Sequence, residues 1–317
     1  MNTIFFILRQ TLTFSIPLLV VALGGMFSER SGVVNIALEG TMVFGAFTSI
    51  LFINTVQDTM SGQFLLLLAI LIAGVSGILI SLLHAYASIN MKANQVISGT
   101  AINMLTPAIA IYVARMIQDV QQINFNNTFR IPLVPVLGKI PGLGDVFFKD
   151  AYITTYLGIA ILIVSSIVLY KTKFGLRLRA CGEHPHAADS VGINVYKIRY
   201  AGVMLSGLLG GIGGLIFVIP TSTNFNATVA GYGFLALAVL IFGQWKPMRI
   251  LFASLFFGLM KTIAATYSSI PFLLNLGVPN TFFKMTPFLA TLIVLAFTSK
   301  KSQAPKASGI PYDKSSR

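Results

Sequence analysis

Residues 171–199 read KTKFGLRLRACGEHPHAADSVGINVYKIR and form a polar, basic segment between two long apolar runs. Six of its side chains are basic, whereas only Glu183 and Asp189 are acidic. Such a segment is either a cytoplasmic loop of a membrane protein or a docking surface for a soluble partner, and here we expect it to be both.

The composition of the chain indicates a membrane protein. Of its 317 residues, 55% are hydrophobic and 10% are charged, whereas a soluble domain has about 25% charged residues. Apolar runs of roughly 17–25 residues can cross a bilayer as helices. The chain offers about nine such runs, near residues 10–27, 33–54, 64–87, 95–117, 151–170, 200–220, 229–243, 249–267 and 286–298. We therefore predict an all-α polytopic membrane protein with about 8–10 transmembrane helices.

The distribution of charge along the chain predicts its topology. A net charge of +13 would suggest nucleic acid as a partner of a soluble protein, but here the basic residues gather in alternate loops, so we expect no nucleic acid. Loop 171–199, the turn at 244–249 and the tail after Ser299 are basic, whereas the intervening loops carry no net charge. The positive-inside rule then places 171–199 and the C-terminus in the cytoplasm and lets the Lys and Arg side chains meet anionic lipid.

These boundaries give one transmembrane domain, residues 1–299, followed by a basic cytoplasmic tail, 300–317. If all nine runs cross fully, the N-terminus lies outside. The second run begins directly after Ser31 and could instead be a broken or re-entrant helix. Residues 118–150, rich in Pro, Gly and Asn, read as an irregular external loop.

Glycines cluster in the run at 200–220, where the spacing of Gly207 with Gly211 and of Gly210 with Gly214 favours close helix packing within one chain over a dimer interface. We find no internal sequence repeat, which gives no support to an inverted-repeat architecture.

Polar residues inside apolar runs are candidates for the substrate pathway, because they are costly in a membrane. Asn35 and Glu39 are one helical turn apart, and a second polar set opens the fourth run. For Asn35 and Glu39 a structural bond to a neighbouring helix, or a helix cap, is an equally good interpretation. Lys261 is expected to extend to the membrane interface. The candidate pathway residues are Asn35, Glu39, Asn94, Gln95, Ser98 and Asn103.

No catalytic or metal-binding pattern is recognisable. The single cysteine, Cys181, excludes an internal disulfide and argues against a cysteine metal site. The three histidines lack carboxylates at metal-ligand spacing, and no Walker A phosphate loop occurs. We therefore expect no enzyme activity, metal or cofactor in this chain.

Four blocks of sequence resemble the permease subunits of ABC importers for nucleosides and simple sugars, a group that also contains ribose and branched-chain amino acid permeases. They are ALGGMFSERSGVVNIALEG (22–40), KANQVISGTAIN (92–103), FGLRLRACGEHPHAADSVGINV (174–195) and GYGFLALAVLIFGQWKP (231–247). Their order and spacing match over most of the chain, and the first block is similar to the nucleoside branch.

This resemblance implies an ABC importer permease fold and a set of partners. A second permease, an extracytoplasmic binding lipoprotein and a cytoplasmic ATPase that holds ATP and Mg would complete a bacterial importer in the cytoplasmic membrane. In that family the block at 174–195 contains the coupling helix that enters the ATPase, and Pro185 suits the first position of such a helix. His184 and His186 depart from the Asn and Arg more often found there. The implied coupling residues are Gly182, Glu183, His184, Ala187, Ala188, Asp189, Gly192 and Ile193.

Two other functions are compatible with the sequence. A permease for a simple sugar such as ribose or galactose would share these blocks. A secondary transporter that needs no ATPase would require ion-coupling carboxylates, for which Glu39 is the one reasonable intramembrane candidate.

Overall fold

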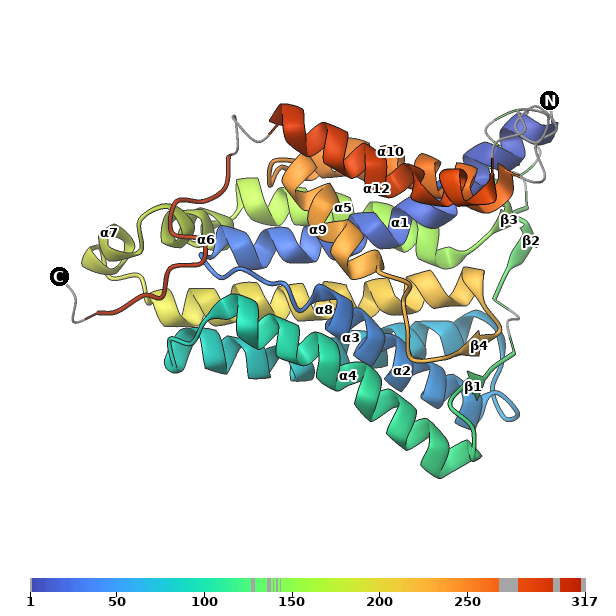
Figure 1. Ribbon diagram of the computed structural model, residues 1–317, viewed down its shortest axis with the longest axis horizontal. Helices are drawn as coiled ribbons and strands as arrows, with labels where there is room; N and C mark the ends of the chain where they lie inside the picture. Colours follow the sequence, from blue (N-terminus) through green and yellow to red (C-terminus); the bar gives the residue numbers. More distant parts are fainter. Residues whose placement is uncertain are drawn as a thin grey trace.

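The computed structural model describes residues 2–126, 129–135, 138, 140, 142, 144–267, 279–298 and 303–314. Its helices lie side by side along one long axis (Figure 1), and seven of those described are long and apolar enough to cross a bilayer. These seven are α1 (Asn2–Arg30), α2 (Leu38–Val56), α3 (Gly62–Ala85, continued by a π-helix at Tyr86–Asn90), α4 (Gln95–Gln118), α5 (Ile153–Lys171), α8 (Val195–Thr221) and α10 (Pro247–Thr266). With α9 (Tyr232–Phe242) and α12 (Asn280–Thr298) the described bundle confirms the predicted all-α polytopic fold.

The two ends of the bundle differ in structure. One end carries α6 (Lys173–Glu183) and α7 (Pro185–Ser190), and we call it the basic end. The other carries four short strands and is called the hairpin end: β1 (Ile123–Asn124), β2 (Ile131–Leu133), β3 (Lys149–Ala151) and β4 (Asn224–Phe225). Helix α1 begins at the hairpin end, so the described N-terminus and α7 lie at opposite ends of the bundle, as the count of nine crossings predicts.

Helices α2 and α9 do not span the bundle, because each begins near its middle (Figure 1). The chain leaves α1 at the basic end, where Gly32 has a φ of +97°, a value that glycine adopts without strain. Residues 31–37 then return to the middle without regular structure before α2 starts. The broken-helix alternative for the second apolar run is therefore correct, because residues 31–37 and α2 together lead from the basic end to the hairpin end. Helix α9 follows a comparable segment, 222–231, that enters from the hairpin end.

The two short helices run in opposite directions, and so do the long helices that precede them, α1 and α8 (Figure 1). The packing follows the same relation: α3 packs against α8 and α10 against α1, while α2 packs against α8 and α9 against α1. The arrangement is an inverted pair of helix groups. Our inference against an inverted architecture is thus wrong, because helix order and packing are repeated here without a recognisable repeat of residues.

Close packing of α8 against α2 and α3 depends on its glycines. A Cβ atom on Gly207 would overlap the Gly77 carbonyl, and one on Gly211 would overlap the Ala73 carbonyl. Gly214 meets the Met42 carbonyl of α2 in the same way. These contacts confirm that the glycine cluster packs helices within one chain.

The region 118–150 is more ordered than the expected irregular loop. Strand β1 pairs with β4, and β2 pairs with β3. Asp150 forms ion pairs with Arg9 of α1 and with Arg130, the latter at 3.0 Å. Each of these strands is only two or three residues long, and so the periodicity of the sequence gives little indication of the strands. Positions such as Asn127, Lys139 and Pro141 of the predicted loop lie outside the described residues.

Candidate functional site

Glu39 joins the two half-helices at the middle of the bundle. It lies in the first turn of α2, and its carboxylate accepts hydrogen bonds from the backbone N–H groups of Gly231, at 2.9 Å, and Gly233, at 2.6 Å. These N–H groups belong to the start of α9, where a helix has unpaired donors and a partial positive charge. A carboxylate satisfies both, so Glu39 couples α2 to α9 across 192 residues of sequence. We call this contact the Glu39 junction.

The extended segment 31–37 is held by side chains of α3 and α4. His84 lies within 2.9 Å of the Val34 carbonyl, and Gln95 accepts from the Val34 N–H at 2.7 Å. Asn103 donates to the Ile36 carbonyl and accepts from the Gly40 N–H. Backbone outside a helix needs such partners within a membrane, because no water is present to replace them.

The six candidate pathway residues therefore have defined structural contacts. Asn35 is fully buried and donates to Ser206 of α8 at 2.8 Å, Ser98 lies 2.6 Å from the His84 ring, and Asn94 caps α4 through the Val96 and Ile97 N–H groups. The alternative interpretation of Asn35 and Glu39, a bond to a neighbouring helix, describes both contacts. A role of these six residues in a pathway stays a prediction.

His84 was missed by the sequence reasoning, although a histidine inside an apolar run was a usable signal. Its ring is fully buried and contacts both Ser98 and the Val34 carbonyl of segment 31–37. Its contact with Val34 could not be inferred, because residues 31–37 look like part of a continuous helix.

A cavity of about 540 Å³ opens beside the Glu39 junction, between α1, α8, α10 and α12. Its walls combine aromatic rings with hydrogen-bonding groups. Lys261 lies over the rings of Tyr232 and Phe288, at 5.2 and 5.7 Å from their centroids. It lines the cavity, and its expected place at the membrane interface stays a prediction. The principal lining residues are Gln10, Phe14, Phe217, Thr221, Tyr232, Lys261, Lys284 and Phe288.

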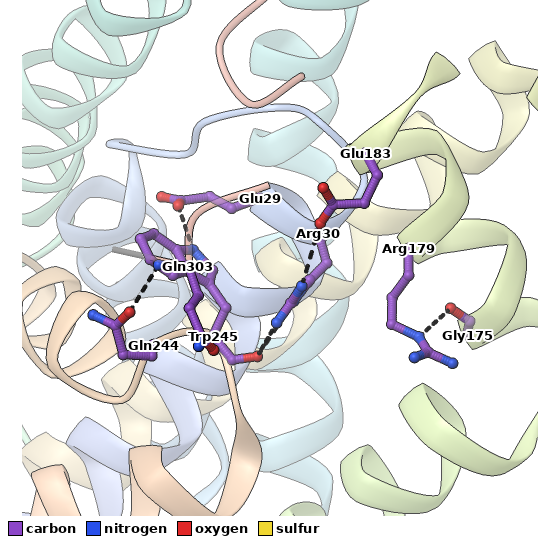
Figure 2. Close-up of polar contacts among 8 residues, drawn as sticks. All are labelled: Glu29, Arg30, Gly175, Arg179, Glu183, Gln244, Trp245 and Gln303. Atoms are coloured by element: carbon purple, nitrogen blue, oxygen red, sulfur yellow. Dashed lines mark hydrogen bonds and ion pairs between the residues drawn. The ribbon is translucent and has the colours of Figure 1, made fainter. Parts of the chain in front are cut away.

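At the basic end, the last turn of α1 contacts both the α9–α10 connection and α6, as Figure 2 shows. Glu29 accepts from the indole N–H of Trp245 at 2.6 Å, and Arg30 donates to the Trp245 carbonyl at 3.1 Å. A guanidinium nitrogen of Arg30 also lies 3.8 Å from a carboxylate oxygen of Glu183. These contacts connect the end of α6 to the turn that follows half-helix α9.

The predicted coupling residues occupy the connection from α6 to α8. The structure confirms a short helix that starts at Pro185 and stops before Gly192, whose φ is +84°. Ala188 is 97% buried, and a Cβ on Gly182 would overlap the Arg30 carbonyl. The others lie at the end of α6 (Glu183), before α7 (His184), within it (Ala187, Asp189) and after it (Ile193). The role of these residues in coupling to an ATPase stays a prediction.

Helix α6 itself was missed, since residues 171–199 read as a loop with one short helix. Its signal is weak but present: Leu178 and Cys181, three positions apart, are buried, whereas the neighbouring Arg177 is exposed.

Residues 303–313 are not a free basic tail but cross the basic end as an ordered segment, here called the strap. The Ala307 N–H donates to the Gly182 carbonyl at 2.8 Å, and the Gly309 N–H donates to the Gly32 carbonyl at 3.2 Å. Arg199 donates to the Ile310 carbonyl at 3.0 Å. The strap thus touches α6, α8 and the segment 31–37. Lys300, Lys301 and Arg317 lie outside the described residues.

Tyr312 anchors the strap under α7. Its ring is buried against His186 and Tyr196, with centroids 5.1 and 5.5 Å away. It shares an apolar cluster with Cys181 and Ala188. Beside it, Lys92 and Asp313 form an ion pair at 2.6 Å, and hydrogen bonding to Asp313 raises the pKa of Lys92.

Removing the Tyr312 ring should release the strap and expose Cys181. Burial raises the pKa of the Cys181 thiol to about 11, so little thiolate forms at neutral pH and a maleimide should label the native protein slowly. In a Tyr312→Ala variant we expect labelling several times faster. The matched control Tyr112→Ala removes an exposed tyrosine of α4 and should leave the rate unchanged. Equal rates in all three proteins would refute the anchoring role.

Known proteins match this chain over nearly its whole length. The family model described as "Branched-chain amino acid transport system / permease component" matches residues 7–296. A nucleoside ABC transporter permease protein of Lactococcus lactis is 43% identical over 99% of this chain and 98% of its own length. A guanosine ABC transporter permease protein of Bacillus subtilis is 45% identical over 98% of this chain and 97% of its own length.

More distant relatives include a putative glucose ABC transporter permease protein of Haloferax volcanii, 28% identical over 94% of this chain and 93% of its own length. No solved structure matches the chain significantly. The match of the family model over nearly the whole bundle, together with relatives above 40% identity, shows that this chain belongs to the branched-chain amino acid transport system permease family and is an ABC transporter permease.

Proposed function

We propose that this permease forms part of the pathway by which an ATP-driven importer takes up nucleosides. The observation that carries the proposal is the cavity beside the Glu39 junction, where aromatic rings and hydrogen-bonding side chains line one space of about 540 Å³. Its volume falls within the range of roughly 300–1,000 Å³ typical of small-molecule sites. A nucleoside offers a flat base for the rings and a ribose for the polar groups, and the names of the two relatives above 40% identity support this choice.

The inverted half-helices suit alternating access. Helices α2 and α9 both start at the Glu39 junction, so a shift of one group against the other would change which side of the junction is open. The cavity is lined from the hairpin-end halves of α1 and α8, whereas α6, α7 and the strap cover the basic end. We infer that a nucleoside stays bound on the hairpin side of the junction until one helix group shifts against the other.

The basic end is proposed to face the cytoplasm of a bacterial cell and to receive the ATPase on α7. The small, exposed side chain of Ala187 would allow close contact with a groove, while the buried Ala188 would fix α7 on the chain. The Arg30 contacts with Glu183 and Trp245 would transmit the movement to α9. ATP and Mg would be held by that ATPase. A second permease and a substrate-binding lipoprotein on the hairpin side would complete the importer.

Nucleoside uptake tests this proposal directly. Cells lacking their own nucleoside importers would receive the permease with its ATPase, second permease and lipoprotein. We expect uptake of labelled nucleoside that depends on ATP and on this chain. The same cells with the ATPase inactivated provide the control, and no gain of uptake for any common nucleoside would refute the proposal.

A bulky residue in α7 is expected to uncouple the ATPase from transport. Replacing Ala188 with Trp places a large ring where the native side chain is 97% buried between Cys181, Val195 and Tyr312. We expect nucleoside uptake to fall about tenfold or more, because overpacking displaces α7, while the amount of protein in the membrane stays similar. The control Ser190→Ala changes an exposed position of α7. Coupled ATP hydrolysis and uptake in the Ala188→Trp variant would contradict this role.

Import of a simple sugar is the second candidate, supported by the name of the Haloferax volcanii relative. Competition distinguishes the two candidates. Excess ribose, galactose or glucose should leave nucleoside uptake unchanged if our first proposal is right, and should block transport if the sugar proposal is right.

A further inference from the structure

The cavity beside the Glu39 junction contains a buried hydroxyl without a partner. Tyr232 follows Gly231 at the start of α9, and its ring packs against Phe217 with centroids 4.1 Å apart. The residue is 98% buried, and its hydroxyl has no hydrogen-bond partner among the described residues. A buried polar group left unpaired costs about 1–3 kcal/mol. Since Tyr232 lines the cavity, a molecule bound there could supply the missing partner.

Lys261 adds unpaired donors to the same space. Its ammonium group lies over the rings of Tyr232 and Phe288 and is attracted by the charge of Glu39. It makes no hydrogen bond or ion pair with a described residue. A lysine has three N–H donors and no acceptor. Acceptor atoms of a molecule in the cavity could bond to these donors.

The remaining polar groups reinforce this donor character. Lys284 also lines the cavity and can only donate, whereas Gln10 can both donate and accept. Phe14, Phe217 and Phe288 offer flat apolar faces on which a heterocyclic ring can stack. A flat ring with oxygen acceptors at its edge fits this combination better than a ring with an amino group at its edge.

From these contacts we infer that the cavity is a base-selecting site, in which Lys261 favours nucleosides whose base carries a carbonyl oxygen and the Tyr232 hydroxyl supplies a further hydrogen bond. The inference rests on the proposed nucleoside function and names the substrate class of the same site. Guanine presents O6 and N7 as acceptors, whereas adenine presents an amino donor at the corresponding position. The amino group of adenosine would meet the Lys261 ammonium, donor against donor, and leave both without a partner.

A molecule bound to Tyr232 would also lie close to the Glu39 junction. Tyr232 lies between Gly231 and Gly233, the two residues whose N–H groups bond to Glu39. A base bonded to the Tyr232 hydroxyl is thus one residue away from each bond that joins the half-helices.

Inosine and adenosine provide the test, because they differ at the purine 6 position, a carbonyl oxygen in one and an amino group in the other. In cells with the complete importer, unlabelled inosine should inhibit uptake of labelled uridine at a concentration about tenfold lower than adenosine, which corresponds to about 1.4 kcal/mol. In Lys261→Met the ratio should fall to about twofold or less with adenosine inhibition retained. Tyr232→Phe removes a hydroxyl that can donate or accept, so it should weaken inhibition by both nucleosides and leave the ratio near its native value.

Two variants serve as controls for these substitutions. Lys149→Met and Tyr112→Phe make the same chemical changes at exposed positions that do not line the cavity, and both should keep the native ratio. If Lys261→Met abolishes all uptake, Lys261→Arg decides: retention of the inosine preference supports the inference, and its loss with uptake intact contradicts it.

The outcomes separate this inference from the proposed function. Uptake of nucleosides without a preference for inosine, or with the native preference kept in Lys261→Met, would overturn the inference and leave the nucleoside function standing. Absence of nucleoside uptake in the native importer would overturn the proposed function itself.

Discussion

Replacing Gly211 with alanine is expected to destabilise the folded permease strongly, although it adds only one methyl group. A Cβ atom at this position would overlap the Ala73 carbonyl of α3 and lie 3.1 Å from the Gly77 Cα. The obstructing atoms belong to backbone, which cannot rotate away as a side chain can. Helix α8 would have to separate from α3, and overpacking of this kind costs about 3 kcal/mol or more.

The matched control for this prediction lies in the same helix contact. A Cβ on Gly74 would meet side-chain atoms of Ile212 at 3.4 Å, an ordinary contact distance, so Gly74→Ala should behave like the native protein. The measurement is the fraction that stays monodisperse in detergent after heating, with the amount in the membrane as a second readout. Similar melting of the two alanine variants would show that α8 and α3 are less closely constrained than the structure indicates.

Loss of the Glu39 carboxylate should strongly reduce transport. In Glu39→Ala the N–H groups of Gly231 and Gly233 lose their acceptor in the middle of the membrane, where water cannot replace it. Hydrogen bonds to charged groups contribute about 1.5–3 kcal/mol each. We therefore expect nucleoside uptake to fall by more than about tenfold, with lower thermal stability in detergent.

The Glu39→Gln variant tests which property of the carboxylate matters. It keeps one acceptor oxygen but presents an amide donor to the second N–H group, so we expect uptake between those of the native protein and Glu39→Ala. Asp58→Ala removes an exposed acidic residue after α2 and should have no effect. Native uptake in Glu39→Ala would show that α9 is held without the junction.

The sequence was sufficient for the class of fold, because the apolar runs and the alternation of basic loops both follow from the physics of the bilayer. It also located α7, since Pro185 and Gly192 act locally as start and stop signals. The Glu39 junction could not be predicted in the same way. Its partners are backbone N–H groups 192 and 194 residues away, and no side-chain pattern in residues 231–233 identifies them as donors.

The cavity and the strap were missed for a related reason. Lys261 looks like a lysine near the end of a span, and only the packing of α10 against α1 and α12 shows that it lines a cavity. Tyr312 is one aromatic residue in a polar stretch, which composition alone describes as a tail. Its burial depends on α6 and α7 together with α8, so it follows from tertiary structure and not from local sequence.

The strap also has a consequence for how the protein is made. Gly32, Gly182 and Arg199 all bond to backbone between residues 307 and 310, which is synthesised after every described helix. During translation the membrane helices can insert while the surface around α7 still lacks these contacts. That surface can reach its final form only once Tyr312 has left the ribosome, so its completion follows the synthesis of all the described helices.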